Sequence, residues 1–264
     1  MSDYHIHTKL CGHASGEMDA YVQFALTQPL REIGFADHLP MLKWAHPEYA
    51  MAFETLPEYV RNVQRLQRAY PQLPIKLGIE ADYYSAAECQ ATKALLAAYP
   101  FDYVYGSVHF IDAWAIDDPR RLSEWDAQDV NAVYARYFAL LEQAARSGLF
   151  DILAHFDLPK KFGHRPTQDL SGLIAQTLRG VKDSGAAVEI NTAGLRKPVK
   201  EIYPAPAIMR LLKKYEIPIV LGSDAHAPAE VGQDFALART MLKELGHAEV
   251  VIFEQRRLVG TYPL

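Results

Sequence analysis

Two spacings of apolar residues alternate along almost the whole chain. Short apolar runs of strand length are followed by longer segments with an apolar residue at every third or fourth position, as in an amphipathic helix. After a first strand around His5 and His7, the pattern predicts strands at residues 31–36, 74–81, 102–109, 150–155, 187–191, 217–221 and 250–253. It predicts helices at residues 17–28, 56–70, 86–99, 126–147, 170–184, 206–215 and 230–245.

Repeated strand–helix units predict parallel strands, because each helix returns the chain to the same edge of the sheet. About seven such units in 264 residues fit a closed α/β barrel better than an open sheet. No linker rich in Gly, Ser or Pro divides the chain. We therefore expect one domain that spans residues 1–264.

Potential metal ligands follow the predicted strands. His5 and His7 project from one face of the first strand, but this pair alone is a weak signal, since it suits an ordinary structural histidine too. Further candidates lie at or just after the ends of strands: His13, His38, Glu80, His109, His155, Asp224 and His226. In a parallel barrel these ends share one rim, where barrel enzymes keep their active sites. We therefore predict a metal site on that rim.

Nine candidate ligands, seven imidazoles and two carboxylates, are too many for one ion. At four to six ligands for each ion they suit two or three divalent ions. A site rich in nitrogen with a few carboxylates favours Zn, Fe or Mn over Mg or Ca. The spacing does not choose among these metals.

Composition narrows the class of protein. Half of the residues are hydrophobic, which is ample for a core. The formal net charge of -5 gives no overall attraction to nucleic acid. Two cysteines provide no disulfide framework, and neither a signal peptide nor an apolar run long enough to cross a membrane is visible. We expect a cytoplasmic protein that does not associate with membranes.

The chain resembles the PHP (polymerase and histidinol phosphatase) superfamily in motifs that occur in the same order from end to end. They are His5-Ile6-His7 with His13, Asp37-His38, Glu80, His109, His155 and Asp224-Ala225-His226. Within the superfamily it is most similar to the monofunctional histidinol-phosphate phosphatases of histidine biosynthesis, in residues 155–163, 189–197 and 256–264.

The resemblance implies a distorted seven-stranded, TIM-like β/α barrel with a trinuclear metal centre. It assigns His5, His7, Glu80 and Asp224 to one ion. Glu80 would bridge to a second ion, completed by His109 and His155, and a third would be held by His13, His38 and His226. The implied reaction is hydrolysis of L-histidinol phosphate, a small phosphorylated substrate.

A metal-bound water ionises near neutral pH, so we expect metal-bound hydroxide to attack the phosphorus, with Glu80, Asp224 and His226 in the catalytic group. Arg165 and Arg196 follow predicted strands, and guanidinium binds phosphate bidentately, so both are candidate substrate ligands. Lys161 and Lys197 are expected to be solvated. The group that protonates the departing alcohol is not identified.

The remaining histidines lie outside the metal pattern. His247 is expected at the surface, and His164, beside Arg165, is a weaker candidate for contact with the substrate. His46 lies in a long aromatic loop with Trp44, which either covers the site or packs on the barrel. Cys11 is expected to be a small buried thiol rather than a ligand.

Two other functions stay open. A related phosphoesterase acting on nucleotides or nucleic-acid ends would use the same ligands, although the chain has no basic aromatic groove for a long nucleic acid. A metal-bound module without catalysis is the second alternative, and the complete ligand set argues against it.

Overall fold

The structure is a computed structural model that describes residues 1–43, 46 and 48–264. Its centre is a sheet of parallel strands in the order β1-β2-β3-β4-β7-β8-β9. These strands are β1 (Ser2–Ile6), β2 (Glu32–Phe35), β3 (Ile75–Asp82), β4 (Tyr103–Ser107), β7 (Ile152–Leu153), β8 (Ala187–Asn191) and β9 (Ile219–Gly222). The backbone of Ala225, just after β9, accepts from His7 at 2.9 Å and donates to His5 at 3.1 Å. The two edges of the sheet therefore meet, and the predicted barrel is confirmed.

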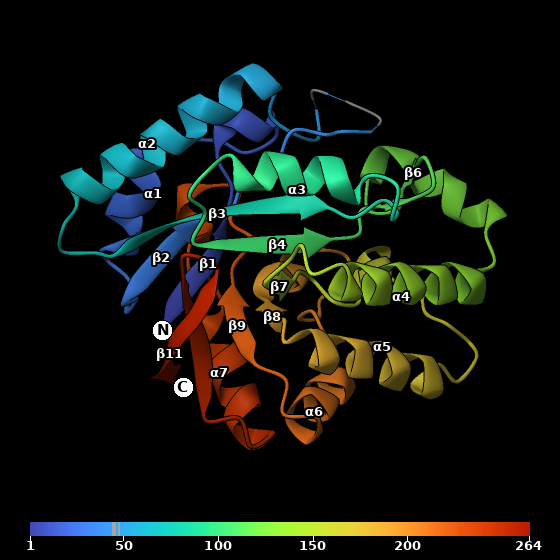
Figure 1. Cartoon of the computed structure of the whole chain (residues 1–264). Helices are drawn as coiled ribbons and strands as arrows, with labels where there is room; N and C mark the ends of the chain where they lie inside the picture. Colours follow the sequence, from blue (N-terminus) through green and yellow to red (C-terminus); the bar gives the residue numbers. More distant parts are fainter. Residues whose placement is uncertain (44–45, 47) are drawn as a thin grey trace.

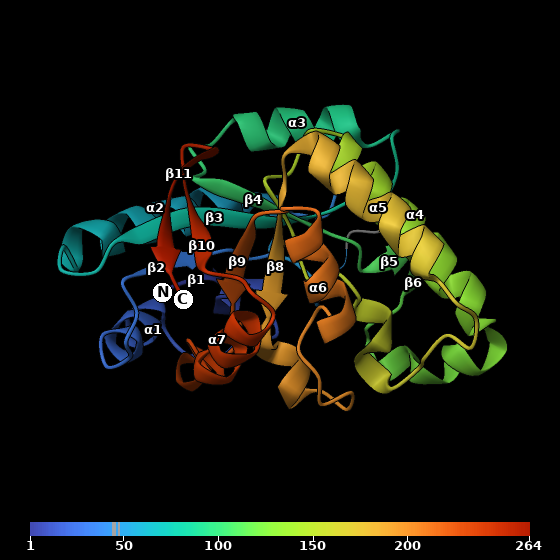
Figure 2. The ribbon, with the colours of Figure 1, turned by 90° about the horizontal axis from the view of Figure 1, so that it is seen from below.

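Helices surround the strands (Figures 1 and 2). They are α1 (Met18–Ala25), α2 (Leu56–Ala69), α3 (Cys89–Ala97), α4 (Val130–Arg146), α5 (Ser171–Ser184), α6 (Pro206–Lys214) and α7 (Phe235–Glu244). In α2 the buried residues recur at helical spacing: Leu56, Tyr59, Val60, Val63 and Leu66. The helices thus bury one apolar face each against the barrel, and this outer layer holds most of the core.

The last helix begins later than predicted. The pattern predicts a helix from residue 230, whereas α7 starts at Phe235 after a 3-10 turn at Pro228–Glu230. Between them, Gly232 and Asp234 have left-handed backbones, with φ of 66° and 63°. Because a right-handed helix cannot pass through such residues, apolar periodicity alone places the start too early.

Two hairpins were not predicted. β5 (Phe110–Ile111) pairs with β6 (Trp114–Ala115), and each strand is too short for an alternating pattern. β10 (Glu249–Glu254) pairs with β11 (Arg257–Pro263). The sequence predicts the first of these strands, at residues 250–253, but not the second. β11 is mostly exposed, so it lacks the apolar alternation that identifies a strand.

The β10–β11 hairpin lies at the amino-terminal ends of the barrel strands. The backbone of Phe253 donates to the hydroxyl of Tyr4 at 3.3 Å, and Arg256 donates to the carbonyl of Asp102 at 2.8 Å. Phe253 joins Tyr4 and Tyr103 in a second, smaller core that fills the barrel interior. The opposite end of the barrel is left for the candidate ligands.

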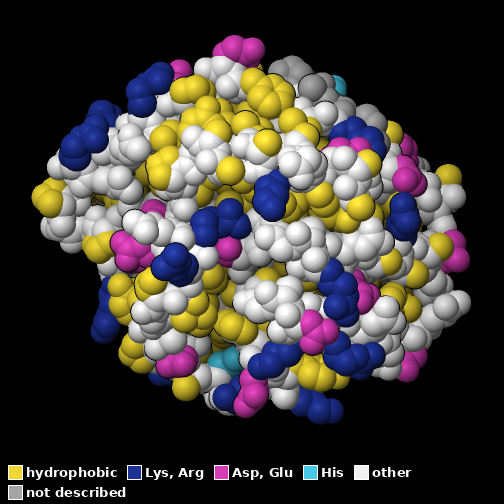
Figure 3. All heavy atoms as spheres, in the orientation of Figure 1, with side chains coloured by type: hydrophobic (Ala, Val, Ile, Leu, Met, Phe, Trp, Pro, Cys, Tyr) yellow, Lys and Arg dark blue, Asp and Glu magenta, His cyan; other side chains and the backbone are white. Residues whose placement is uncertain are grey.

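The exterior carries charges of both signs. On the described part of the face drawn in Figure 3, Lys and Arg side chains are interspersed with Asp and Glu and form no continuous basic stripe. Among the described residues, no helix has the length and apolar character needed to cross a membrane.

Candidate metal centre

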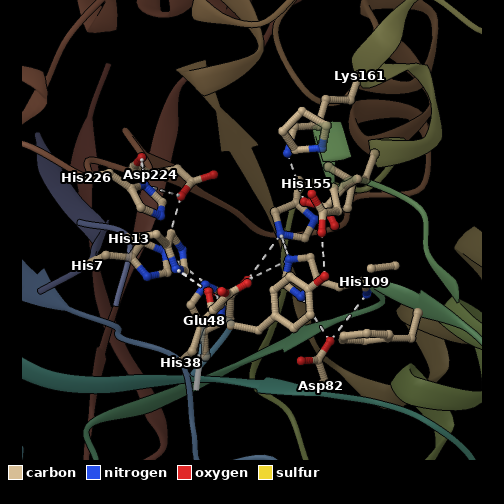
Figure 4. Close-up of a pocket in the computed structure, with 18 of the residues that line it drawn as sticks. His7, His13, His38, Glu48, Asp82, His109, His155, Lys161, Asp224 and His226 are labelled. Carbon is tan, nitrogen blue, oxygen red and sulfur yellow. Dashed lines mark hydrogen bonds and ion pairs between the residues drawn. The ribbon is translucent and has the colours of Figure 1, made fainter. Parts of the chain in front are cut away.

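The candidate ligands converge at the carboxyl-terminal ends of the strands, around a cleft of about 540 Å³. Eight of the nine line it: His7, His13, His38, Glu80, His109, His155, Asp224 and His226. His5 lies beneath the cleft and is fully buried. In Figure 4, His7, His13 and His226 gather with Asp224 on one side, and His109 and His155 gather on the other.

Glu80, at the end of β3, lies between these groups. One carboxylate oxygen is 3.1 Å from Nε2 of His155 and accepts a hydrogen bond from Ser107 at 2.5 Å. The other is 3.0 Å from Nδ1 of His38 and 3.5 Å from Nε2 of His5. A carboxylate with imidazoles at both oxygens has the geometry of a bridging ligand.

Asp224 brings the last strand to the centre. Its Oδ1 is 3.2 Å from Nε2 of His7 and 3.9 Å from Nε2 of His5. The ring of His226 stacks on His7 with 4.1 Å between centroids, and the ring of His13 stacks on His226 at 4.9 Å. Residues at the ends of the first and the last barrel strands therefore face one another where the two edges of the sheet meet.

The buried polar atoms suit bound cations. Among the described residues, Nε2 of His5 and Oε2 of Glu80 are buried without a hydrogen-bond partner. Nε2 of His109 points at Nε2 of His155, 3.2 Å away. Buried polar atoms are normally paired, and clustered imidazole nitrogens and carboxylate oxygens are the donor set of divalent transition metals. The residues present therefore fit metal binding.

The carboxylates are held in the form that binds metal. Burial alone would raise the pKa of Glu80, but the imidazoles of His38, His5 and His109 outweigh burial and hold its pKa well below the usual range. Burial would likewise raise the pKa of Asp224, and His5 and His7 oppose it, so its pKa is also well below the usual range. Both carboxylates are therefore ionised and can bind a cation.

Acidic side chains behind the rings were missed in the sequence. Asp82 is 2.9 Å from Nδ1 of His109, and Glu189 is 2.6 Å from Nδ1 of His5. A carboxylate at one ring nitrogen turns the other toward a metal. Asp82 was detectable, because it lies two residues after Glu80 on the same strand and so shares its face.

The predicted arginines lie outside the residues that line the cleft. Arg165 is half-exposed, and its guanidinium pairs with Glu201 at 2.6 Å. Arg196 is mostly buried and donates to the backbone oxygen of Ser223 at 2.6 Å. Its Nη1 is buried and has no hydrogen-bond partner in the part of the chain that the structure describes. A role in substrate binding stays a prediction for both, and only Arg196 keeps a free buried donor.

Three other basic residues line the cleft: Arg120, Lys161 and Lys197. The expectation that both lysines are solvated was wrong. Lys161 pairs with Asp117 at 2.9 Å and has a largely buried side chain. Burial, followed by the charge of Lys161, lowers the pKa of Lys197. The basic loops fold back onto the barrel rim, which helical or strand periodicity does not reveal.

The other histidines and Cys11 have surroundings that differ from those of the candidate ligands. His247, expected at the surface, is buried, with Nε2 3.0 Å from the carbonyl of Met209. The ring of His164 stacks on Trp125 at 4.3 Å and is not among the residues that line the cleft. Cys11 is fully buried, as expected. The role suggested for Trp44 lies outside the described residues.

The fold and the site together define a barrel protein with a metal-binding cleft rich in histidine. The chain belongs to the PHP domain family, whose model matches residues 3–193, and a PHP-associated model matches residues 207–247.

Proteins of similar sequence match this chain along most of its length. A probable histidinol-phosphatase of Deinococcus radiodurans is 43% identical, over 98% of both chains. The histidinol-phosphatase of Bacillus subtilis is 29% identical, over 87% of this chain and 95% of its own.

Two solved structures share the fold. One is histidinol phosphate phosphatase from Lactococcus lactis in complex with Zn, L-histidinol and phosphate, with a TM-score of 0.83 and 22% identity over 98% of both chains. The other is a putative histidinol phosphatase from Listeria monocytogenes, with a TM-score of 0.81 and 24% identity. It covers 90% of this chain and 99% of its own.

Proposed function

We propose that this protein is a metal-dependent phosphomonoesterase that hydrolyses L-histidinol phosphate to L-histidinol and phosphate in histidine biosynthesis. The observation that carries the proposal is the 43% identity, over 98% of both chains, to the probable histidinol-phosphatase of Deinococcus radiodurans. The nine candidate ligands at one cleft support it. So does the Lactococcus structure, in which Zn, L-histidinol and phosphate are bound to a protein of the same fold.

The proposed ligands divide among two or three divalent ions. His5, His7, Glu80 and Asp224 would hold one ion, Glu80 with His109 and His155 a second, and His13, His38 and His226 a third. Among the described residues, ligand atoms of His5, His7 and Glu80 lie within 4.8 Å of one another, which supports the first part of this division. When bound, such ions supply Lewis-acid stabilisation of phosphoryl charge and activate water as a nucleophile; Zn, Fe and Mn each suit the donor atoms.

The chain's own residues orient the substrate. The free Nη1 of Arg196 is proposed to donate to a phosphate oxygen, because guanidinium binds phosphate through charge-assisted hydrogen bonds. Lys161 and Lys197, which line the cleft, add positive charge against the dianionic ester. Arg165 keeps a proposed role as a second phosphate ligand, for which its bond to Glu201 must open.

Two further proposals concern organisation and place. Residues 1–264 are proposed to form one domain, because strands β1 and β9 from opposite ends of the chain close the same barrel. A cytoplasmic location follows from the proposed biosynthetic role and agrees with the free thiols of Cys11 and Cys89.

A parallel assay tests the reaction. Metal-replete protein is given L-histidinol phosphate, a nucleoside monophosphate and a single-stranded oligonucleotide, and phosphate release is followed. We expect a clear preference in kcat/KM for L-histidinol phosphate. Preference for either of the other substrates would indicate a phosphoesterase of nucleotides or nucleic-acid ends, and no turnover of any phosphomonoester would indicate a module without catalysis.

A further inference from the structure

Glu189 is a fully buried carboxylate beneath the cleft. It lies on β8, between the strands that carry His155 and Asp224 in the barrel order. It is not among the residues that line the cleft, nor in any cluster of potential ligand atoms found among the described residues. A buried charge is costly unless its partners compensate for it, so its contacts indicate its role.

One oxygen of Glu189 fixes a ring. Oε1 lies 2.6 Å from Nδ1 of His5. Because a carboxylate accepts, Nδ1 carries the hydrogen, and the lone pair of Nε2 faces Glu80 and Asp224. Tyr105 stacks on the same ring with 4.6 Å between centroids. The carboxylate of Glu189 and the ring of Tyr105 thus fix the orientation of the His5 ring.

The other oxygen fixes a backbone. Oε2 accepts from the backbone N–H of His155 at 2.9 Å and from the side-chain amide of Asn191 at 3.0 Å. His155 has a φ of 24°, a conformation that is strained for a residue with a side chain. The amide of Asn191 also donates to Asp224 at 3.2 Å. Glu189 therefore touches His5 and His155 directly and reaches Asp224 through one residue.

Gly222 leaves the space that this carboxylate occupies. A Cβ at position 222 would lie 1.9 Å from Oε1 of Glu189 and 2.8 Å from Cβ of His5. Both distances are shorter than real Cβ contacts, and both neighbours are fully buried. A side chain here would push the carboxylate away from the ring it holds.

We propose that Glu189 is a positioning residue that sets His5 and His155 for metal binding at the same time, and that Gly222 is required to admit it. The inference rests on the proposed metal centre but not on the identity of the substrate. His5 and His155 are assigned to different ions, so one carboxylate prepares the ligands of both. Loss of Glu189 would therefore weaken the binding of more than one ion, although Glu189 itself is not a ligand of any ion.

The test measures metal binding rather than turnover. Glu189→Gln and Gly222→Ala are purified, stripped with a chelator, and titrated with Zn²⁺ against a chromophoric chelator. Outer carboxylate partners of metal-binding histidines are worth about 10-fold to 100-fold in affinity, so we expect losses of that size. The absorption spectrum of the Co²⁺-loaded protein should also change, because the ring of His5 is no longer held.

Matched controls lie at the other end of the barrel. Glu32→Gln alters a buried carboxylate that accepts from Tyr4, and Gly34→Ala crowds the hydroxyl of Tyr103 to 2.1 Å. Both should lower the melting temperature of the stripped protein without changing Zn²⁺ affinity in the folded fraction. The proposal is wrong if Glu189→Gln keeps the wild-type affinity for Zn²⁺. It is also wrong if the control variants lose as much Zn²⁺ affinity as Glu189→Gln.

Two further results keep the test decisive. Should Glu189→Gln fail to fold with Zn²⁺ present, Gly222→Ala and Glu189→Asp carry the same comparison, and wild-type affinity in both would overturn the proposal. If wild-type protein binds Zn²⁺ but releases no phosphate from L-histidinol phosphate, the proposed function is wrong. The role of Glu189 in metal binding can still be measured in that case.

Discussion

Single side chains in the centre serve more than one partner. Glu80 shares its two oxygens between imidazoles on both sides of the cleft, and Asp224 faces His5 and His7 while Asn191 donates to it. Such sharing makes each residue hard to replace, because one substitution disturbs several contacts. The effect of a substitution should therefore follow the number of partners a side chain has.

Glu80→Gln should abolish both activity and metal retention. Glutamine keeps the shape but loses the charge that a bridging ligand supplies, so Zn²⁺ affinity should fall by more than about 100-fold, beyond the effect of an outer-shell partner. Metal content by mass spectrometry and turnover of L-histidinol phosphate check this. Glu17→Gln, at an exposed carboxylate paired with Lys9, serves as the control, and full metal content in Glu80→Gln would contradict the ligand assignment.

Arg196→Gln should weaken substrate binding rather than metal binding. The variant lacks the free Nη1 donor, and a hydrogen bond to a charged group is worth about 1.5–3 kcal/mol, so KM should rise about 10-fold to 100-fold. Arg146→Gln, on the outer face of α4 beside Glu142, should leave KM unchanged. Steady-state kinetics with metal content measured in parallel separates the two effects, and an unchanged KM in Arg196→Gln would remove its proposed role.

At this scale the sequence predicts the nine candidate ligands but not their partners. Ligands at strand ends can be read from order along the chain, because parallel strands deliver their ends to one rim. That Glu189 faces His5 depends on ring orientation and on the space left by Gly222. Lys161 was assigned to solvent because its pairing with Asp117 joins loops 44 residues apart.

The β10–β11 hairpin and the barrel strands have different tasks. The strands present the candidate ligands at one end, and the hairpin fills the other through Phe253 beside Tyr4 and Tyr103. Sequence patterns found the strands and helices of the barrel because each repeats a regular spacing. They missed β11 because its side chains are mostly exposed and therefore show no apolar alternation.

Phe253→Ala should destabilise the protein without changing the centre. Removing a buried aromatic ring typically costs about 3–5 kcal/mol, and Phe253 is only 5% exposed. Denaturant unfolding of the metal-loaded protein measures the loss in the free energy of unfolding. In buffer without denaturant, kcat/KM should stay at the wild-type value. Phe53→Ala, at a ring that is 46% exposed, should change stability by less than about 0.5 kcal/mol; a comparable loss there would mean that burial is not the cause.

Over the whole molecule, the centre joins segments from one end of the chain to the other. His5 lies on the first strand, Glu80 on the third and Asp224 just after the last strand of the barrel. The general architecture follows from sequence periodicity. The closing contact does not, because the backbone bridge between Ile6 and Ala225 leaves no apolar pattern in the sequence.

Removal of metal should lower the melting temperature. Among the described residues, the buried atoms Nε2 of His5 and Oε2 of Glu80 have no hydrogen-bond partner. A ligand present at about 100 times its Kd stabilises a folded protein by about 2.7 kcal/mol. Thermal unfolding of chelator-treated protein, before and after addition of Zn²⁺ or Mn²⁺, measures the difference. Addition of Mg²⁺ is the control, since it prefers all-oxygen sites. Identical melting with and without metal would argue against a centre that links the strands.

The bridge between Ile6 and Ala225 also has a consequence for biosynthesis of the protein. A chain still emerging from the ribosome exposes His5 and His7 long before Asp224 and His226 are synthesised. It therefore offers only part of a ligand set until the final strand docks. The full set of candidate ligands is thus assembled only after Asp224 and His226 have been synthesised and the barrel has closed.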